Sequence, residues 1–292
     1  MPVYGDARSL SACLSALAET AGETRWRVLL VDDHSPFPEI DAALDRHCDA
    51  PWAHLRRLPE NRGYIGAVNA ALAIVPEGDI VLLNSDCVVP AGDWIDRLAA
   101  HATADNGTRI GTVTPLASDG QAFGFPQPFH AAPAFLGNRL KRIDAAARKA
   151  NAGRATRMLT SVGFCTYVTR ACLDATGGLS AEGLTAGYGE EVDFCLRAAK
   201  AGFRHLAATD CFVTHLGSAS FGAAKRALVR RNEAVLERRY PDYFARFAAQ
   251  CNADPLRRPW WRSWWTATRP RTGRQTCRQR HSRRSARCRR TP

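Results

Sequence analysis

The chain has 292 residues, 46% of them hydrophobic, and a formal net charge of +12. This composition is typical of a globular protein with a substantial core, and no apolar run approaches the roughly 18 residues of a membrane span. The first residues lack the basic and apolar regions of a secretory signal peptide. The ten cysteines form no CxxC pair and no Cys/His spacing suited to zinc. We therefore expect a cytoplasmic protein whose cysteines are mostly buried and reduced.

The positive charge is concentrated at the C-terminal end of the chain. Residues 256–292 hold thirteen arginines and no Asp, Glu or Lys, so the preceding part is nearly neutral, with 27 basic and 28 acidic residues. Nucleic-acid binding by the whole protein is therefore not expected. The tail also contains four of the seven tryptophans. Its composition predicts disorder, with a peripheral contact at the inner membrane face or a nucleic-acid arm as the alternatives.

Apolar runs alternate with segments of helical spacing, which predicts an α/β fold with a single, mostly parallel central sheet flanked by helices. In chain order, we expect strands at residues 27–31, 79–83, 110–114, 159–169, 204–206 and 211–215. We expect helices at residues 65–75, 91–101, 192–201 and 223–249, the last broken at Pro241. Residues 117–157 follow no clear period, which predicts a mobile or variable region.

Acidic residues follow two of the predicted strands. Asp32 and Asp33 end one strand, and Asn84, Ser85 and Asp86 end another. Because ligands of open α/β sheets bind beyond the carboxyl ends of the strands, such carboxylates can contact a nucleotide or ligate a divalent metal. Each group alone also fits an ordinary turn or helix cap. Together they indicate a nucleotide with a metal.

A histidine ends a third strand. His215 alone is more often a structural hydrogen-bonding residue than a ligand. If it faces Asp86, however, the pair could form an Asp/His site for Mg²⁺ or Mn²⁺.

A further acidic group lies at residues 187–197, where Glu190, Glu191 and Asp193 follow a two-glycine turn at the start of a predicted helix. Carboxylates in a first helical turn are stabilised by unpaired N–H groups and by the helix dipole. The stretch therefore fits either ordinary capping or a fixed, ionised general base. The absence of GxxxxGK[ST] and GxGxxG argues against a P-loop NTPase and a dinucleotide-binding dehydrogenase.

Taken together, these motifs resemble the family 2 inverting glycosyltransferases with the GT-A fold, and are similar to bacterial O-antigen, capsule and rhamnosyl transferases. The matching stretches, in family order, are residues 2–4, 31–35, 61–69, 82–86, 177–178, 187–197 and 215–222. The resemblance implies a GT-A domain over residues 1–255, with a Rossmann-like nucleotide-sugar half at 1–115 and an acceptor half at 116–255.

The resemblance also implies roles for particular residues. The expected nucleotide-sugar-binding residues are Pro2, Tyr4, Asp33, Asn61, Gly63, Asn69, Ser85 and Asp86. Asp86 and His215 would hold the metal, with Ser85 in place of the first acid of the family motif. Glu191 would be the catalytic base. Because family members often carry the shorter Asp there, Glu190 and Asp193 remain alternatives.

The implied activity is nonprocessive, metal-dependent, inverting sugar transfer, since the membrane spans and the QxxRW motif of processive synthases are absent. The resemblance favours Mn²⁺ or Mg²⁺ and a UDP- or dTDP-sugar donor, with dTDP-rhamnose as the best single guess. The acceptor would be a glycan or lipid-linked oligosaccharide of a cell-surface polysaccharide. Family members also place an apolar strand directly before the segment matching Pro2. Without that strand, the alternative is a catalytically inactive, sugar-nucleotide-binding module. A nucleotidyltransferase is disfavoured because its Gly/Lys-rich loop is absent.

Overall fold

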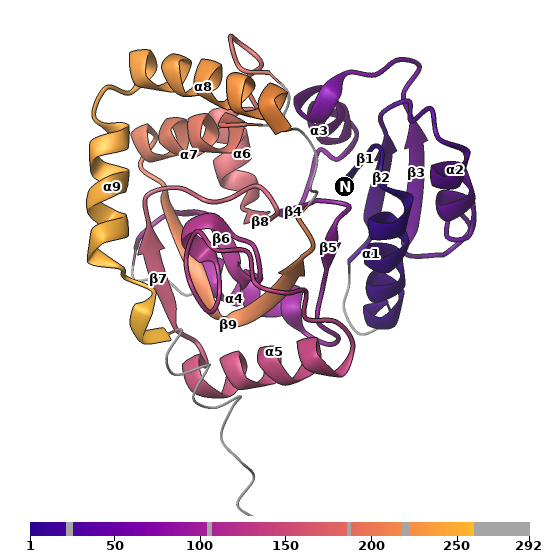
Figure 1. Ribbon diagram of the computed structural model, residues 1–292, viewed down its shortest axis with the longest axis horizontal. Coiled ribbons are helices and arrows are strands. Elements are labelled where there is room, and N and C mark those ends of the chain that lie inside the picture. Colours follow the sequence, from indigo (N-terminus) through magenta and orange to yellow (C-terminus); the bar gives the residue numbers. More distant parts are fainter. Residues whose placement is uncertain (22–25, 104–106, 186–187, 218–221, 260–292) are drawn as a thin grey trace, which may run out of the picture.

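The computed structural model describes residues 1–21, 26–103, 107–185, 188–217 and 222–259 (Figure 1). Its strands are β1 (Pro2–Val3), β2 (Val28–Asp32), β3 (Ala53–Arg57), β4 (Ile80–Leu83), β5 (Cys87–Val88), β6 (Ile110–Ala117), β7 (Ala155–Met158), β8 (Cys165–Val168) and β9 (Arg204–His215). Its helices are α1 (Ala7–Thr20), α2 (Pro38–Asp45), α3 (Gly63–Ile74), α4 (Trp94–Thr103), α5 (Asn138–Asn151), α6 (Arg170–Thr176), α7 (Glu190–Lys200), α8 (Gly222–Arg239) and α9 (Tyr243–Ala253), with a 3₁₀ turn at Gln121–Phe123.

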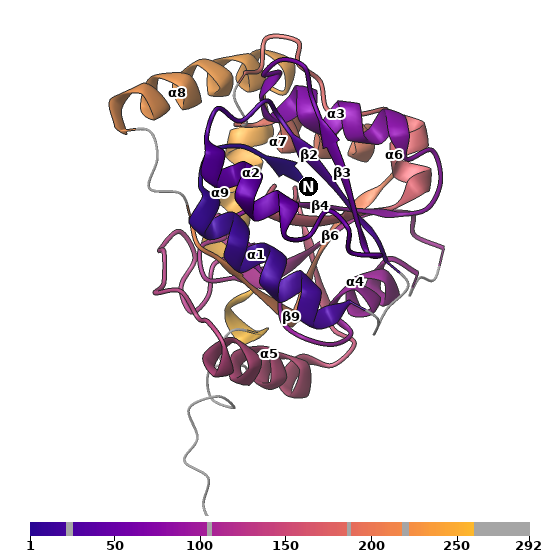
Figure 2. The same ribbon diagram turned by 90° about the vertical axis from the view of Figure 1, so that its right-hand side faces the viewer.

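The first part of the chain forms a small parallel sheet in the order β1-β2-β3. Helix α1 packs against α2, and α3 packs against β2. Figures 1 and 2 show this unit standing beside the larger sheet. The carboxyl ends of β1 and β2 and the start of α3 therefore lie at one edge of the unit, where the acidic loop after β2 was expected to bind a nucleotide.

The second sheet has the order β4-β8-β6-β9-β5, with β7 also paired to β9. Only the β6–β9 pair among these described strands is parallel. The α/β class is confirmed, but the expectation of one mostly parallel sheet is corrected to two hydrogen-bonded sheets, the larger one mainly antiparallel. The reason is that every residue of β8, which is antiparallel to both β4 and β6, is buried. A fully buried antiparallel strand has the same continuous apolar pattern as a parallel one.

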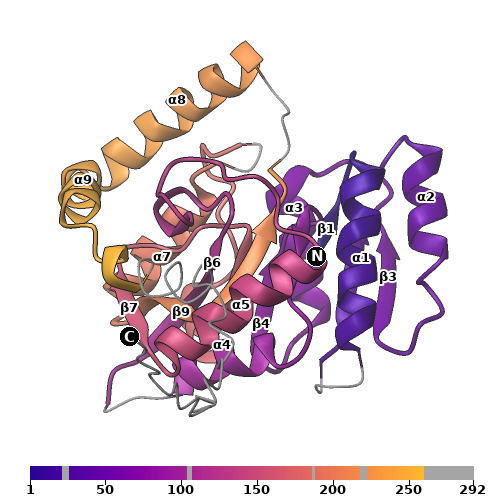
Figure 3. The same ribbon diagram turned by 60° about the horizontal axis from the view of Figure 1, so that its bottom comes forward.

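Residues 117–157 are also more regular than expected, because they include the fourteen-residue helix α5. Its buried side chains Leu140, Ile143 and Ala147 recur at helical spacing and face β9. Figure 3 shows α5 lying along the large sheet. Alanines and charges dilute the apolar signal of this segment, so tertiary packing rather than local pattern reveals the helix.

Strand β9 is continuous, where two short strands were expected. The polar residue Asp210 interrupts the apolar pattern, but it is buried and fully engaged. Its carboxylate lies 2.7 Å from Nε2 of His101 and accepts from the amide of Gly153 at 2.9 Å. Because its polar atoms are satisfied inside the fold, the strand passes through this position without breaking.

A cavity of about 510 Å³ separates the two sheets beside β2 and β4, and its lining includes Met1, Val28, Leu29 and Ile80. Met1 donates its buried amino group to the Leu29 carbonyl at 2.8 Å, and burial lowers the pKa of this amino group to about 5. The apolar strand that the resemblance places before Pro2 is not tested by the described residues and stays a prediction.

The predicted tail falls almost entirely outside the described residues, which end at position 259. Its expected disorder and membrane contact therefore stay predictions. Within the described parts of the chain, no helix is both long enough and apolar enough to cross a membrane.

Candidate active site

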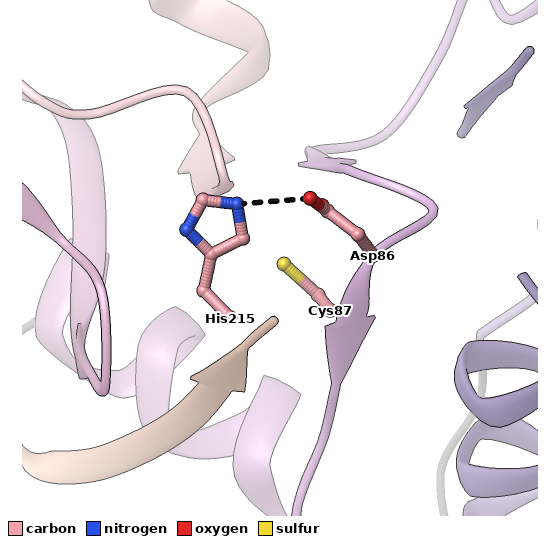
Figure 4. Close-up of side chains that lie close together, drawn as sticks. All are labelled: Asp86, Cys87 and His215. Atoms are coloured by element: carbon pink, nitrogen blue, oxygen red, sulfur yellow. Dashed lines mark ion pairs between the residues drawn. The ribbon is translucent and has the colours of Figure 1, made fainter. Parts of the chain in front are cut away.

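Asp86 and His215 come together where β5 pairs with the end of β9. The antiparallel register places Cys87 opposite His215 and Val88 opposite Thr214. Nε2 of His215 lies 3.3 Å from Oδ2 of Asp86, and Figure 4 shows the two side chains pointing toward each other. The expectation that His215 faces Asp86 is confirmed.

His215 is held in a fixed orientation by two further contacts. Its Nδ1 lies 2.5 Å from the carbonyl of Asp119, which can only accept, so Nδ1 carries the proton. The imidazole stacks on Phe164, with centroids 5.4 Å apart and 21° between the planes. Burial acts to lower the pKa of His215, but the hydrogen bond and charge of Asp86 outweigh it and raise the pKa.

The surroundings of Asp86 fit a cation. Its Oδ1 is buried and has no hydrogen-bond partner within the described residues, and the same holds for Oδ1 of Asn84. Asp86, Cys87 and His215 each offer one ligand atom, and these atoms all lie within 4.8 Å of one another. Histidine ligands of metals usually donate their other ring N–H to a carbonyl or carboxylate, as His215 does to Asp119.

The second acidic group lies at the start of α7. Gly189 precedes the helix with φ of 91°, and a Cβ there would also lie 2.9 Å from Leu236, so both the backbone and the packing require glycine. Oε2 of Glu191 accepts from the Gly189 amide at 3.2 Å. Burial raises the pKa of Glu191 above its ordinary value. Gly187, the first residue of the predicted motif, lies outside the described residues.

Glu190 is more deeply buried than its neighbour, with 2% exposure. Its Oε2 has no hydrogen-bond partner within the described residues. Burial, and then the charge of Glu191, raise the pKa of Glu190 well above its ordinary value. Of the two adjacent carboxyl groups, Glu190 thus has the more strongly raised pKa.

Asp193 is fully committed to structural contacts. Its carboxylate accepts from Arg197 at 2.8 Å, from Arg239 at 3.0 Å and from the Tyr240 hydroxyl at 2.9 Å. Asp193 is 1% exposed. It therefore ties α7 to the end of α8 and has no free face toward a substrate.

Three residues outside the predicted site connect the Asp86/His215 pair with Glu191. Phe164 stacks on His215, while a Cβ on the preceding Gly163 would lie 3.8 Å from the Tyr64 hydroxyl and 4.0 Å from Cδ of Glu191. Burial raises the pKa of Tyr64 well above its ordinary value, with further contributions from Glu190, Glu191 and Asp86 among its neighbours. Tyr64 was detectable inside the matched stretch 61–69, whereas Gly163 and Phe164 carry no motif.

The loop after β2 is bonded to the start of α3. Oδ1 of Asp33 accepts from the Arg62 amide at 2.7 Å, and the Asp33 carbonyl accepts from Asn61 at 3.1 Å. Oδ1 of Asn61 in turn accepts from the amide of Gly63 at 3.2 Å. Burial raises the pKa of Asp33 despite the opposing hydrogen bonds from Arg62 and Gly63. The structure thus brings together three of the predicted nucleotide-site residues.

Two exposed aromatic side chains lie at the same end of the small sheet. Tyr4 is 52% exposed and Phe37 43% exposed, and their rings meet edge to face with centroids 6.3 Å apart. Pro2 lies in β1 opposite Val31. Phe37 was missed, although an aromatic residue between two prolines directly after a strand is a detectable signal.

Asn69 is placed differently from the other predicted nucleotide-site residues. Its amide donates to the Leu179 carbonyl at 2.8 Å and accepts from the Leu179 amide at 2.9 Å. A Cβ on Gly178 would lie 2.4 Å from Oδ1 of Asn69, so the loop before α7 needs glycine there. Asn69 therefore links α3 to this loop. Ser85 lies half-buried in the turn beside Asp86.

This arrangement, with two sheets meeting beside an Asp/His pair and an acidic helix start, is the GT-A fold of glycosyltransferases. The chain belongs to glycosyl transferase family 2, whose family model matches residues 1–156.

Solved structures with the same fold share little sequence with this chain. The mannosyltransferase PcManGT from Pyrobaculum calidifontis, in complex with GDP-Man and Mn²⁺, has a TM-score of 0.56 and 18% identity, over 91% of this chain and 68% of that one. GalNAc-T7 with UDP, GalNAc and Mn²⁺ has a TM-score of 0.54 and 18% identity, over 73% of this chain and 43% of that one. S. aureus TarS 1–349 has a TM-score of 0.50 and 17% identity, over 73% of this chain and 58% of that one. No curated protein matches the sequence.

Proposed function

We propose that this protein is a nonprocessive, inverting, metal-dependent glycosyltransferase that moves a sugar from a nucleotide-sugar donor to an acceptor hydroxyl. The observation that carries the proposal is the connection between the Asp86/His215 pair and Glu191. Phe164 stacks on His215, and the adjacent Gly163 lies beside Tyr64 and Glu191. A donor diphosphate at the Asp86/His215 pair and an acceptor hydroxyl at Glu191 would then lie in one reaction site.

Glu191 acts as the general base in this proposal. Ionised Glu191 takes the proton from the acceptor hydroxyl as that oxygen attacks the anomeric carbon, and the bond to the nucleoside diphosphate breaks on the opposite face. A single displacement of this kind inverts the anomeric configuration. The raised pKa of Glu191 makes its carboxylate a stronger base, and the Gly189 amide fixes one of its oxygens.

Glu190 and Asp193 are less suited to this role. Glu190 is buried and favours its protonated form, and Asp193 already accepts three hydrogen bonds. Of the three expected carboxylates, Glu191 is the one that is partly exposed.

Asp86 and His215 are the proposed metal ligands, and Ser85 lies beside them. A bound Mn²⁺ or Mg²⁺ would neutralise charge on the departing diphosphate. The fold neighbours PcManGT and GalNAc-T7 carry Mn²⁺ in their structures, which supports a divalent cation here. The unpartnered, buried Oδ1 of Asp86 supports it independently.

The nucleotide would lie along the end of the small sheet. Tyr4 and Phe37 offer aromatic faces to a base, and Pro2 lies two residues before Tyr4, in β1 opposite Val31. Asp33, Asn61 and Gly63 hold the adjoining loop, and Asn69 joins α3 to the loop before α7 through Leu179. We propose a UDP- or dTDP-sugar as donor, dTDP-rhamnose first among them.

The proposed acceptor is a glycan or lipid-linked oligosaccharide in cell-surface polysaccharide synthesis. Such an acceptor would place the enzyme in the cytoplasm, with the Trp/Arg-rich tail in peripheral contact with the inner membrane face. The acceptor half, residues 116–255, contributes α7 and the end of β9 to the proposed site.

A screen of nucleotide-sugars by thermal shift tests the donor site, because a ligand that binds the folded state raises its melting temperature. Wild type should be stabilised by one donor with Mn²⁺ and not with a chelator, and Asp86→Ala should lose the effect. Stabilisation without any donor turnover would favour the alternative, an inactive sugar-nucleotide-binding module. No stabilisation by any nucleotide-sugar would contradict both readings.

A further inference from the structure

The strand pairing at the proposed metal site brings in a third side chain that the sequence alone did not assign. Cys87 follows Asp86 directly and lies opposite His215 in the β5–β9 ladder. Side chains of such cross-strand pairs have Cβ atoms about 4.5–5.5 Å apart and lie on the same face of the sheet. Figure 4 shows Sγ of Cys87 between the imidazole and the carboxylate.

We propose that Cys87 Sγ is the third protein ligand of this site, which would make it selective for thiophilic divalent cations such as Zn²⁺, Co²⁺ or Cd²⁺ over Mg²⁺. This inference rests on the proposed function, because it concerns the same cation. It changes the protein ligands of the cation from one oxygen and one nitrogen to one oxygen, one nitrogen and one sulfur.

The distances within the cluster fit such a cation. Two nitrogen or oxygen ligands about 2.0 Å from Zn²⁺ at the tetrahedral angle lie roughly 3.3 Å apart. His215 Nε2 and Asp86 Oδ2 are separated by 3.3 Å. All three ligand atoms lie within 4.8 Å of one another, so small side-chain rotations complete the set. Three protein ligands leave positions open for diphosphate oxygens, as in catalytic zinc sites.

Burial, and then the charge of Asp86, raise the pKa of the Cys87 thiol well above its ordinary value, so it is the bond to a metal that would displace the proton. The thiol donates to the Phe164 carbonyl at 3.1 Å, but this carbonyl also accepts from the Asn84 amide at 2.9 Å. When a metal–sulfur bond forms, the thiol proton passes to solvent and the carbonyl keeps a donor. No oxidant or reductant is required. Thiolate ligation is what favours Zn²⁺, Co²⁺ and Cd²⁺ over the hard cation Mg²⁺.

The test is the absorption spectrum of the full-length protein titrated with Co²⁺ alone. Wild type should show a thiolate-to-cobalt charge-transfer band, and Cys87→Ser should bind Co²⁺ without it. Cys165→Ser, which alters another buried cysteine near Cys87, is the matched control and should keep the band. By calorimetry, the preference for Cd²⁺ over Mg²⁺ should fall at least about tenfold in Cys87→Ser, because losing a ligand exceeds the usual second-shell effect.

A measurement on wild type alone guards against misfolding of the variant. X-ray absorption of the Zn²⁺-loaded protein should show one sulfur neighbour at about 2.3 Å. Co²⁺ binding without the band, a band that persists in Cys87→Ser, or zinc without a sulfur neighbour would overturn the ligand role of Cys87 and leave the proposed function intact. If the protein binds Mn²⁺ but neither Co²⁺ nor Zn²⁺, this inference falls and the proposed function stands; if it binds no divalent cation at all, the metal dependence falls as well.

Discussion

Phe164 lies flat against His215, with ring centroids 5.4 Å apart, and its carbonyl accepts hydrogen bonds from the Asn84 amide and the Cys87 thiol, which flank Ser85 and Asp86 in the chain. One residue thus supports both the imidazole and the turn that carries the carboxylate. Because β8 begins at Cys165, the position of Phe164 is fixed by the large sheet. The proposed cation site is therefore positioned by the second half of the fold as well as by the first.

Phe164→Leu should weaken divalent-cation binding about tenfold, at the low end of the range for residues that orient metal ligands. The smaller side chain leaves His215 free to rotate away from Asp86. Calorimetry with Mn²⁺ measures the change. Phe125→Leu, which shortens another buried phenylalanine away from Asp86, should leave the affinity unchanged. Equal affinity in wild type and Phe164→Leu would show that the stacking does not orient the imidazole.

Glu191→Gln should lower sugar transfer by about 10²–10⁴-fold, the usual contribution of a general base. Donor affinity and melting temperature should change little, because Glu191 acts on the acceptor and Gln can still accept from the Gly189 amide. Transfer rates and donor titration separate the two effects. Full activity in Glu191→Gln would remove this residue from the role of base.

Asp193→Ala should behave differently from Glu191→Gln, because it leaves Arg197 and Arg239 without their buried partner. Removing one member of a buried ion pair costs about 3–5 kcal/mol. We expect a large loss in the free energy of unfolding, measured by urea denaturation. If Asp193→Ala were as stable as wild type but inactive, Asp193 rather than Glu191 would be the better assignment for the base.

The burial of Glu190 predicts a pH-dependent stability. Its pKa is raised well above 4.5 in the folded protein, so the folded state keeps a proton that the unfolded chain has already released. The stabilisation that this proton gives the folded state is fully present below pH 4.5. It is lost as the pH rises through the pKa of Glu190 in the folded protein, by up to about 1.4 kcal/mol per pH unit. Glu190→Gln removes this titration. The free energy of unfolding of the variant, relative to that of wild type, should therefore increase from pH 5 to pH 8.

Thermal melts of wild type and Glu190→Gln across that range provide the measurement. Glu237→Gln changes an exposed glutamate on α8 and should keep a constant offset from wild type. A stability difference between Glu190→Gln and wild type that stays constant with pH would contradict the prediction.

Gly178→Ala should destabilise the protein, because the added methyl would lie 2.4 Å from Oδ1 of Asn69. Displacing that side chain breaks its two hydrogen bonds to Leu179, at a cost of about 1–3 kcal/mol. In a double-mutant cycle, Gly178→Ala should cost much less when Asn69 is already alanine. Additive effects would show that the two residues are not coupled.

Features with local signals were predictable from the sequence. The loops at Asp33, Asp86 and Glu191 combine acidic residues with neighbouring apolar runs, and the structure places each at the end of a strand or the start of a helix. The break at Pro241 was predictable for the same reason, since proline cannot continue a helix. These elements need only local information.

Features set by long-range pairing were not predictable. The sequence shows no zinc-like spacing between Cys87 and His215, yet the sheet places them opposite each other. The bonds between Asn69 and Leu179 likewise join distant segments and reveal Asn69 as a support for the loop before α7. Strand direction was also hidden, because a fully buried strand such as β8 gives the same pattern whether its neighbours are parallel or antiparallel.

The most direct test of the central claim is turnover of radiolabelled nucleotide-sugars by the wild-type protein with Mn²⁺, with Glu191→Gln and Asp86→Ala run in parallel. The proposal predicts release of labelled sugar from one UDP- or dTDP-sugar by wild type, loss of turnover in both variants, and retained donor binding in Glu191→Gln alone. Failure of wild type to bind or turn over any donor, or full turnover by Asp86→Ala, would contradict it.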